Sequence, residues 1–471
     1  MKMQLYIETY GCQMNVADSE VVASILKPFY DVTDQIGDAH LILLNTCSVR
    51  DNAEQRIRKR LKELNFYKKQ KPTLIVGLLG CMAERVKEQL LQEEPTLDFI
   101  AGPDAYRSLP ALIEQSAQGV HSFDILLSEK ETYDDIAPIR YDTNGVSAFV
   151  SIMRGCNNFC TYCIVPFTRG RERSRSPQTI LREVQTLIEQ GFKEVTLLGQ
   201  NVNSYHWLSE SAQAITFAQL VEQVALLSPQ MRVRFATSHP KDLSDELLAV
   251  MAKYDNVCKY IHLPVQAGSS SMLKRMNRSY TREHYLGRIA QIKKIMPDCA
   301  ISTDVIAGFS GETEEEHQET LSVMKEAGYA AAYMFKYSVR EGTLAHKRYV
   351  DDVPDEVKSR RLSEIIDLQQ ELSLQHNQQY VGQESEVLVE GFSKRSQEEL
   401  FGRNSQNIVV IFPKEHYQKG DYVRIRIESC SSATLKGAAI SKNSPPPEGC
   451  PKGGVAPRYE KNAEETKVMS T

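Results

Sequence analysis

The feature that most constrains this chain is a run of three cysteines, Cys156, Cys160 and Cys163, at spacings of four and three residues. Packing alone does not account for this pattern, whereas metal binding does. Tetrahedral zinc and four-cysteine iron–sulfur sites take four protein ligands, but the adjoining sequence offers no further cysteine or histidine. A three-thiolate cluster would leave one iron open to a small molecule, which favours a catalytic site. The alternative is a loop whose cysteines share no ligand.

Length and composition bound the class of protein. The 471 residues predict about three domains at roughly 150 residues each. The first residues do not have the pattern of a signal peptide, and no run of ~18 apolar residues could span a membrane, so we expect a cytoplasmic protein without membrane contact. Ten cysteines in such a chain indicate reduced thiols and metal ligands rather than disulfides.

Three further cysteines, Cys12, Cys47 and Cys81, recur at separations of 35 and 34 residues. Each follows an apolar run and precedes a helix-favouring stretch; the predicted strands are 4–9, 41–45 and 73–79, and the helices 18–29, 53–67 and 83–92. The period matches a strand–helix unit repeated in a parallel sheet, whose strands end at one edge. The thiols would then converge as a second cluster site, the alternative being three cysteines packed in the core.

A second alternation of strands and helices occupies the middle of the chain. Strands are predicted at 148–153, 194–198, 232–237, 259–264, 300–306 and 331–337, with helices at 179–190, 217–226, 282–295 and 314–327. Six such units form an incomplete version of the eight-unit barrel, whose chemistry lies at the carboxyl ends of the strands. Polar residues at those ends outline a site for a polar cofactor, although each alone fits a loop hydrogen bond equally well. They are Gln200, Ser238, Gln266 and Asp304.

Two segments are strongly basic although the chain has a net charge of −5. Residues 50–71 hold nine Lys or Arg against three Asp or Glu. Directly after the cysteine loop, Arg169, Arg171, Arg173 and Arg175 alternate with other residues. Both segments suit a large anionic substrate such as a phosphate backbone, while a solvated helix face is the alternative for the first.

The carboxyl-terminal part has a different pattern. A predicted helix at 354–379 is followed by short strands at 385–389, 408–412, 422–429 and 433–440, which indicate a small antiparallel β-barrel, a fold that often binds nucleic acid. We expect packing roles for Cys258, Cys299 and Cys430, and none for Cys450. The predicted α/β organisation is an amino-terminal parallel-sheet domain at 1–120, a partial (β/α)6 barrel at 142–378, the β-barrel at 379–442 and a disordered tail at 443–471.

Five motifs together resemble the methylthiotransferases of the radical S-adenosylmethionine (SAM) superfamily, over residues 3–442. They are Glu8-Thr-Tyr-Gly-Cys-Gln-Met-Asn15, Asn45-Thr-Cys-Ser-Val-Arg50, Gly155-Cys-Asn-Asn-Phe-Cys-Thr-Tyr-Cys-Ile-Val-Pro166, Leu198-Gly-Gln-Asn-Val202 and Ser302-Thr-Asp-Val-Ile-Ala-Gly-Phe309. The first motif is most similar to the branch that acts on isopentenyladenosine in tRNA. Relatives acting on threonylcarbamoyl-adenosine or on a ribosomal-protein aspartate differ there and remain the alternatives within the family.

The resemblance implies two 4Fe-4S clusters, one on Cys156, Cys160 and Cys163 that cleaves SAM, and an auxiliary one on Cys12, Cys47 and Cys81. It implies a 5′-deoxyadenosyl radical that removes hydrogen from carbon 2 of the adenine, then transfer of a methylated sulfur that uses a second SAM. The β-barrel corresponds to the family's TRAM domain. The residues that we expect to contact SAM are Tyr162, Gln200, Ser238, Gln266 and Asp304. Those that we expect to contact RNA are Arg171, Arg173 and Arg175.

The expected partners are tRNA with isopentenyladenosine in its anticodon loop and an electron donor such as flavodoxin or ferredoxin, and the expected state is a monomer. A non-catalytic iron–sulfur protein that binds RNA is the alternative from another class. Such a protein would have no use for two clusters that each lack a fourth protein ligand.

Overall fold

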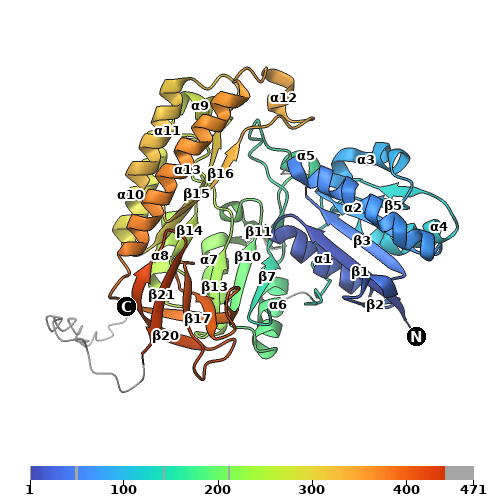
Figure 1. Cartoon of the computed structure of the whole chain (residues 1–471), viewed down its shortest axis with the longest axis horizontal. Helices are drawn as coiled ribbons and strands as arrows, with labels where there is room; N and C mark the ends of the chain where they lie inside the picture. The colour runs from blue at the N-terminus through green and yellow to red at the C-terminus, as the bar shows by residue number, and fades with distance from the viewer. Residues whose placement is uncertain (1, 48–50, 142–143, 210–212, 441–471) are drawn as a thin grey trace, which may run out of the picture.

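The computed structural model describes residues 2–47, 51–141, 144–209 and 213–440. It confirms the α/β fold class, with a parallel-sheet part, a strand–helix arc and a small β-barrel (Figure 1). The tail predicted from residue 443 lies outside the described residues, as does Arg50 of the first basic segment.

Six parallel strands form the amino-terminal sheet: β1 (Met3–Tyr10), β2 (Tyr30–Val32), β3 (Leu41–Thr46), β4 (Ile75–Gly80), β5 (Phe99–Ala101) and β6 (Ser122–Asp124), in the order β2-β1-β3-β4-β5-β6. The three predicted strands are β1, β3 and β4, which are neighbours. Their register places Tyr10 beside Thr46 and Thr46 beside Gly80, so these strands end level at one edge. The other three have three residues each, too few to produce a pattern in the sequence.

Helices cover both faces of this sheet: α1 (Gln13–Leu26), α2 (Asp51–Gln70), α3 (Cys81–Glu93) and α4 (Leu109–Ala117), with short 3-10 turns at Ile36–Asp38 and Tyr106–Ser108. Alternate residues of β3 supply the two cores. Leu43 packs on the side of α1 and α4, and Ile42 on the side of α2 and α3. The first and third helices begin five and two residues before the predicted starts, because Cys12 caps α1 and Cys81 is the first residue of α3.

The middle part contains the six predicted strands: β7 (Ser147–Ser151), β10 (Glu194–Leu198), β13 (Arg232–Phe235), β14 (Tyr260–His262), β15 (Ala300–Ala307) and β16 (Ala331–Lys336). They form two parallel sheets, β7-β10-β13 and β14-β15-β16. A parallel bridge from Val233 to Val257 joins the two sheets, as does the hydrogen bond that Ser238 N donates to His262 O at 3.1 Å. The result is one open arc of six strands, as the sequence predicted.

Helices line the outside of this arc (Figure 1): α6 (Pro177–Glu189), α7 (Phe217–Leu227), α8 (Asp245–Lys253), α9 (Ser270–Arg275), α10 (Arg282–Ile295), α11 (Glu314–Ala327) and α13 (Asp355–Gln378). The short helix α12 (Leu344–Arg348) lies instead beside the cysteine loop, where Ala345 N donates to Thr161 O at 2.7 Å. The smaller elements are β8 (Met153–Arg154), α5 (Val165–Thr168), β9 (Arg173–Ser174), a 3-10 turn at Val202–Ser204, β11 (His206–Leu208) and β12 (Ala214–Thr216).

Five strands close the carboxyl-terminal barrel: β17 (Glu384–Phe392), β18 (Glu399–Arg403), β19 (Val409–Pro413), β20 (Tyr422–Cys430) and β21 (Thr434–Ala439), in the order β17-β18-β19-β21-β20. The sequence prediction missed β18, whose only fully buried large side chain is Leu400. The barrel is also not wholly antiparallel, since β19 pairs with β21 in parallel. A closed ring with an odd number of strands needs at least one parallel pair.

The three parts dock through named contacts. Arg232 and Arg234, at the start of β13, donate to the carbonyls of Arg403 and Asn404, both at 2.7 Å. The β-barrel therefore lies at the amino ends of the arc strands. The amino-terminal part docks through α1, whose Met14 packs with other apolar residues against Leu198.

Candidate functional site

The loop of Cys156, Cys160 and Cys163 rises from the carboxyl end of β7. Its base is closed by the antiparallel pair β8 and β9, and Cys156 N donates to Gly170 O at 3.1 Å. Gly155 has φ of +77°, and a side chain there would collide with the Arg171 carbonyl. The structure thus brings all three thiols together on one short, pinned loop.

Buried groups surround these thiols. Arg278 Nη1 donates to Cys160 Sγ at 3.3 Å, and Asn158 Nδ2 donates to Cys156 Sγ at 3.6 Å. Burial raises the pKa of Cys156 to about 11 and raises the pKa of Cys163 as well. Both thiols are therefore neutral without a metal, and a bound metal would deprotonate them. The donors from Arg278 and Asn158 would then face thiolates. The sequence analysis missed Arg278, since it lies 118 residues from Cys160.

The structure also brings together Cys12, Cys47 and Cys81, at the ends of β1, β3 and β4. A Cβ at Gly11 would lie 2.6 Å from Cys47 Cβ, and a hydrogen bond from Cys47 is the main reason that the pKa of Cys12 falls to about 6. The charge of Cys12 in turn acts on Cys81. Cys12 and Cys81 stand at helix amino termini, where the helix dipole favours a thiolate, although burial outweighs this at Cys81 and raises its pKa.

Two buried asparagines tie these strand ends together. Asn15 Nδ2 donates to Asn45 Oδ1 at 3.0 Å, and Asn45 Nδ2 donates to Ser19 Oγ at 2.9 Å. Thr46 Oγ1 donates to Leu79 O at 2.8 Å. The asparagines of the first two motifs therefore hold the cysteine loops in register.

Arginines on either side of the cysteine loop in sequence contact the amino-terminal part. Arg169 Nε donates to Cys81 Sγ at 3.1 Å, and its Nη2 pairs with Asp18 at 2.8 Å. Arg154 pairs with the same aspartate at 2.8 Å. This buried network joins the scaffolds of the two cysteine triads.

The predicted RNA contacts need a correction here. Arg173 pairs with Asp104 at 2.9 Å, and Arg175 pairs with Asp134 and Glu183 at 3.0 and 2.8 Å. Both side chains are buried in the domain interface, so their guanidinium groups do not face a phosphate backbone. Arg171 remains exposed and lies 5.9 Å from the centre of the Phe159 ring.

The predicted SAM contacts lie at the carboxyl edge of the arc. Gln200 Oε1 and Ser238 Oγ are buried and have no hydrogen-bond partner among the described residues. Gln266 has φ of +71°, and its backbone N donates to Asp304 O at 2.9 Å. Tyr162 Oη accepts a hydrogen bond from Arg278 at 3.4 Å. Because buried polar atoms without partners are costly, this edge fits a polar ligand.

The inner face of β14 to β16 carries residues that the sequence analysis missed. His262 Nδ1 bonds Ser302 Oγ at 2.9 Å, and its Nε2 lies 3.5 Å from Asp304 Oδ1. The His262 ring meets Tyr333 edge-on at 5.6 Å. Tyr333 and Phe335 alternate with Met334 on β16 and are 53% and 40% exposed, whereas Met334 packs against the core. Two large aromatic side chains thus face the inside of the arc.

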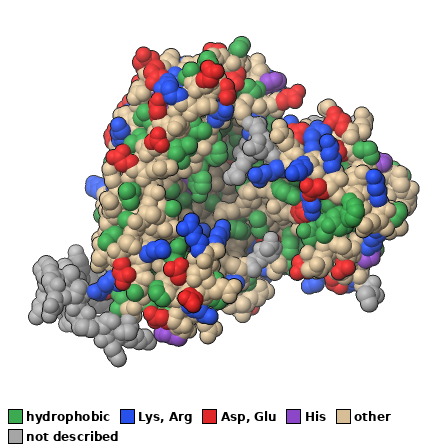
Figure 2. Space-filling model, viewed as in Figure 1, with side chains coloured by type: hydrophobic (Ala, Val, Ile, Leu, Met, Phe, Trp, Pro, Cys, Tyr) green, Lys and Arg blue, Asp and Glu red, His purple; other side chains and the backbone are tan. Residues whose placement is uncertain are grey.

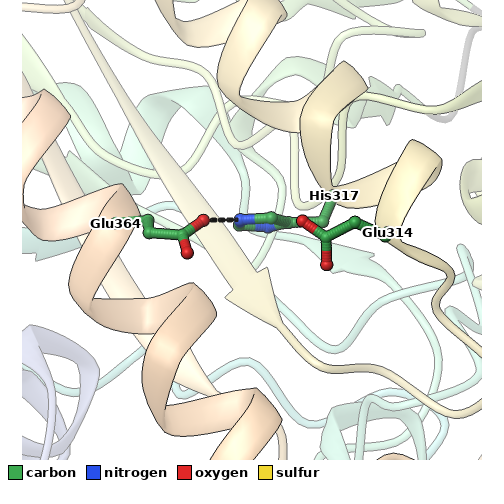
Figure 3. A group of neighbouring side chains, drawn as sticks. All are labelled: Glu314, His317 and Glu364. Atoms are coloured by element: carbon green, nitrogen blue, oxygen red, sulfur yellow. Dashed lines mark hydrogen bonds and ion pairs between the residues drawn. The ribbon is translucent and has the colours of Figure 1, made fainter.

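A third group of possible ligands proves to be an ion-pair network. Side-chain atoms of Glu314, His317 and Glu364 lie within 4.8 Å of one another (Figure 3). Arg360, however, pairs with both carboxylates at 2.6 and 2.5 Å, and Arg361 pairs with Glu314 at 3.3 Å. These guanidinium groups oppose a bound cation, so the group ties α11 to α13.

No helix in the described part of the chain is both long enough and apolar enough to cross a membrane.

Three segments of the chain match known protein families. Residues 4–102 match the uncharacterized protein family UPF0004, 150–324 the radical SAM superfamily and 378–440 the TRAM domain. Among solved structures, the radical SAM methyltransferase TsrM from Kitasatospora setae has a TM-score of 0.54 at 12% identity, covering 73% of this chain and 75% of that one. The cobalamin-dependent SAM radical enzyme OxsB reaches a TM-score of 0.51 at 14% identity, over 78% and 56%. These likenesses show the fold.

Curated relatives are far more similar in sequence. A protein of Bacteroides fragilis is 56% identical over 438 residues, 93% of this chain and 96% of the relative. Proteins of Parabacteroides distasonis and Flavobacterium psychrophilum are 57% and 52% identical over 93% of this chain, and over 96% and 94% of their own lengths. All three are named tRNA-2-methylthio-N(6)-dimethylallyladenosine synthase. This chain therefore belongs to the family of tRNA-2-methylthio-N(6)-dimethylallyladenosine synthases, within the radical SAM superfamily.

Proposed function

We propose that this chain is a radical SAM methylthiotransferase that converts isopentenyladenosine beside the tRNA anticodon to its 2-methylthio derivative. The observation that carries the proposal is the presence of two three-thiol sites linked across one domain interface by Arg169, which lies six residues after Cys163 and donates to Cys81 Sγ at 3.1 Å. One such site would suffice for SAM cleavage alone. A second site beside it fits an enzyme that must also deliver sulfur.

Each triad would hold one 4Fe-4S cluster through three thiolates. When loaded, the loop cluster supplies one-electron cleavage of SAM and the amino-terminal cluster supplies sulfur for transfer. The chain itself buries four of the six cysteines, Cys47, Cys81, Cys156 and Cys160, and leaves Cys12 exposed. It directs buried cationic donors at two of them, Arg278 at Cys160 and Arg169 at Cys81. Both donors match the negative charge of a cluster bound by thiolates.

SAM would bind at the carboxyl edge of the arc, beside the loop cysteines. The unpartnered atoms of Gln200 and Ser238 support polar contacts there. Asp304 and Gln266 are joined by a backbone hydrogen bond, and with Tyr162 they complete the contacts that we propose for the cofactor.

The adenine base would enter the inside of the arc, where Tyr333 and Phe335 offer aromatic surface. Burial of the isopentenyl group against them could contribute about 2 kcal/mol at ~0.8 kcal/mol per methylene. An unpaired loop base can be splayed out of the RNA at low cost.

The phosphate backbone would contact α2 rather than Arg173 and Arg175. Arg56, Lys59, Lys62 and Lys69 are exposed and make no ion pair with any other side chain that the structure describes. They share one face of the helix with Phe66, which is 59% exposed. Lys and Arg side chains gather over the start of α2, beside the hollow between the amino-terminal part and the arc (Figure 2). Arg171 adds an exposed cation near the loop.

We further propose a monomer, located in the cytoplasm with its tRNA substrate, that receives electrons from a flavodoxin or ferredoxin.

The deciding experiment is nucleoside mass spectrometry after anaerobic reaction of the reconstituted enzyme with SAM, reductant and tRNA. We expect 2-methylthio product from tRNA that carries isopentenyladenosine, and much less from tRNA with unmodified adenosine. Equal turnover of both, or product from threonylcarbamoyl-adenosine or a ribosomal-protein peptide, would contradict the proposal.

The RNA surface has its own test. Replacing Arg56, Lys59 and Lys62 with Gln should weaken tRNA affinity and flatten its salt dependence by roughly 0.7–0.9 in log–log slope per lost contact. SAM cleavage without RNA should not change. Arg58→Gln is the matched control, since Arg58 is on the same helix but already paired with Glu54 and Glu93.

A further inference from the structure

Arg169 follows α5, close in sequence to the loop cysteines, but its side chain ends in the amino-terminal part. It is 3% exposed. Its Nε donates to Cys81 Sγ at 3.1 Å across 88 residues of sequence, and its Nη2 pairs with Asp18 across 151. Its Nη1 is buried without a hydrogen-bond partner among the described residues. Part of the guanidinium therefore remains available to a group beside Cys81.

A structural ion pair does not account for Arg169 by itself. Asp18 is already paired with Arg154, whose other Nη donates to Pro103 O at 2.9 Å. Arg154, Arg169 and Arg173 are joined by ion pairs to two carboxylates, Asp18 and Asp104. The two carboxylates balance two of the three buried guanidinium groups, and the remaining positive charge acts on the sulfurs of Cys12 and Cys81. Because excess buried charge is costly, the network favours an anionic group at Cys81.

We propose that Arg169 is a positioning residue through which the radical SAM part of the chain sets the reduction potential of the cluster on Cys12, Cys47 and Cys81. The inference rests on the proposed function for the presence of that cluster. Hydrogen bonds to cluster sulfurs and nearby positive charge stabilise the reduced, more negative cluster. Arg278 makes the equivalent contact to Cys160, but from within the same domain. Only the amino-terminal cluster would then depend on domain docking for its potential.

The test uses a chain in which Cys156, Cys160 and Cys163 are replaced by Ala, so that one cluster remains. Its potential is measured by an anaerobic redox titration followed by electron paramagnetic resonance. We expect Arg169→Met to shift the potential to a more negative value, where a tenfold loss of reduced-state stabilisation corresponds to 59 mV for one electron. Arg169→Lys keeps the positive charge but loses the planar guanidinium group with its several N–H donors, and should give a smaller shift of the potential.

Arg154→Met is the matched control, because it removes the same charge from the same Asp18 and makes no contact to a cysteine sulfur. Its shift should be clearly smaller than that of Arg169→Met. Equal shifts in the two variants, or no shift in either, would overturn the inference while leaving the cluster in place. If the Arg169→Met protein does not bind a cluster, the potentials of Arg169→Lys and Arg154→Lys are compared instead. The inference then requires a larger shift in Arg169→Lys than in Arg154→Lys. A parent chain that binds no iron would instead overturn the two-cluster function, and this inference with it.

Discussion

The two cysteine triads reach similar arrangements by different routes. Cys156, Cys160 and Cys163 lie within eight consecutive residues, on a loop whose base is pinned by β8 and β9. Cys12, Cys47 and Cys81 come from three loops, and only the register of β1, β3 and β4 brings them together. The first triad depends on local backbone, whereas the second depends on the tertiary structure of a whole domain and on an arginine from the next one.

The largest expected effect is the loss of SAM cleavage when the loop cysteines are removed. Changing Cys156, Cys160 and Cys163 to Ala should abolish formation of 5′-deoxyadenosine and leave about four irons, one 4Fe-4S cluster, because Cys12, Cys47 and Cys81 lie at the end of a separate sheet. Iron analysis and chromatography of the SAM products measure both. SAM cleavage by this variant would show that the loop is not the radical site.

The opposite substitution should lose the product but keep the cleavage. With Cys12, Cys47 and Cys81 changed to Ala, SAM should still yield 5′-deoxyadenosine, and mass spectrometry should detect no methylthio group in the tRNA. If the methylthio nucleoside still forms, sulfur does not pass through the amino-terminal site.

A smaller effect should come from the glycines that precede the cysteines. Gly80 has φ of +92°, and a Cβ there would lie 2.5 Å from Asn45 Oδ1 and from Thr46 O, so Gly80→Ala should strain the edge that holds Cys47 and Cys81. Gly155→Ala should strain only the loop. Each should cost more than ~1 kcal/mol of stability, measured by urea unfolding, and each should reduce iron at its own site. Gly37→Ala is the control, since nothing lies within 4 Å of a Cβ there. Loss of both clusters in either variant would contradict the independence of the two sites.

Much of the fold could be predicted because its signals are periodic and local. The strand–helix period located β1, β3 and β4, and the same alternation located all six strands of the arc. Strands of three residues such as β5 carry no such signal. In β18, the charged residues Glu399 and Arg403 lie on the outer face of the barrel, so the sequence of this short strand does not have the apolar pattern by which a strand is predicted.

The two cysteine triads could be predicted from the sequence, but their surroundings could not. Cysteine spacing predicted both triads, and their role as cluster ligands stays a prediction. The run from Arg169 to Arg175 revealed cations but not their partners, and Arg173 pairs with Asp104 across 69 residues. The sequence by itself therefore determined which cysteines are candidate metal ligands. Only the tertiary structure decided which charges are buried against a carboxylate or a thiol and which remain free for RNA, because pairing depends on distance in space.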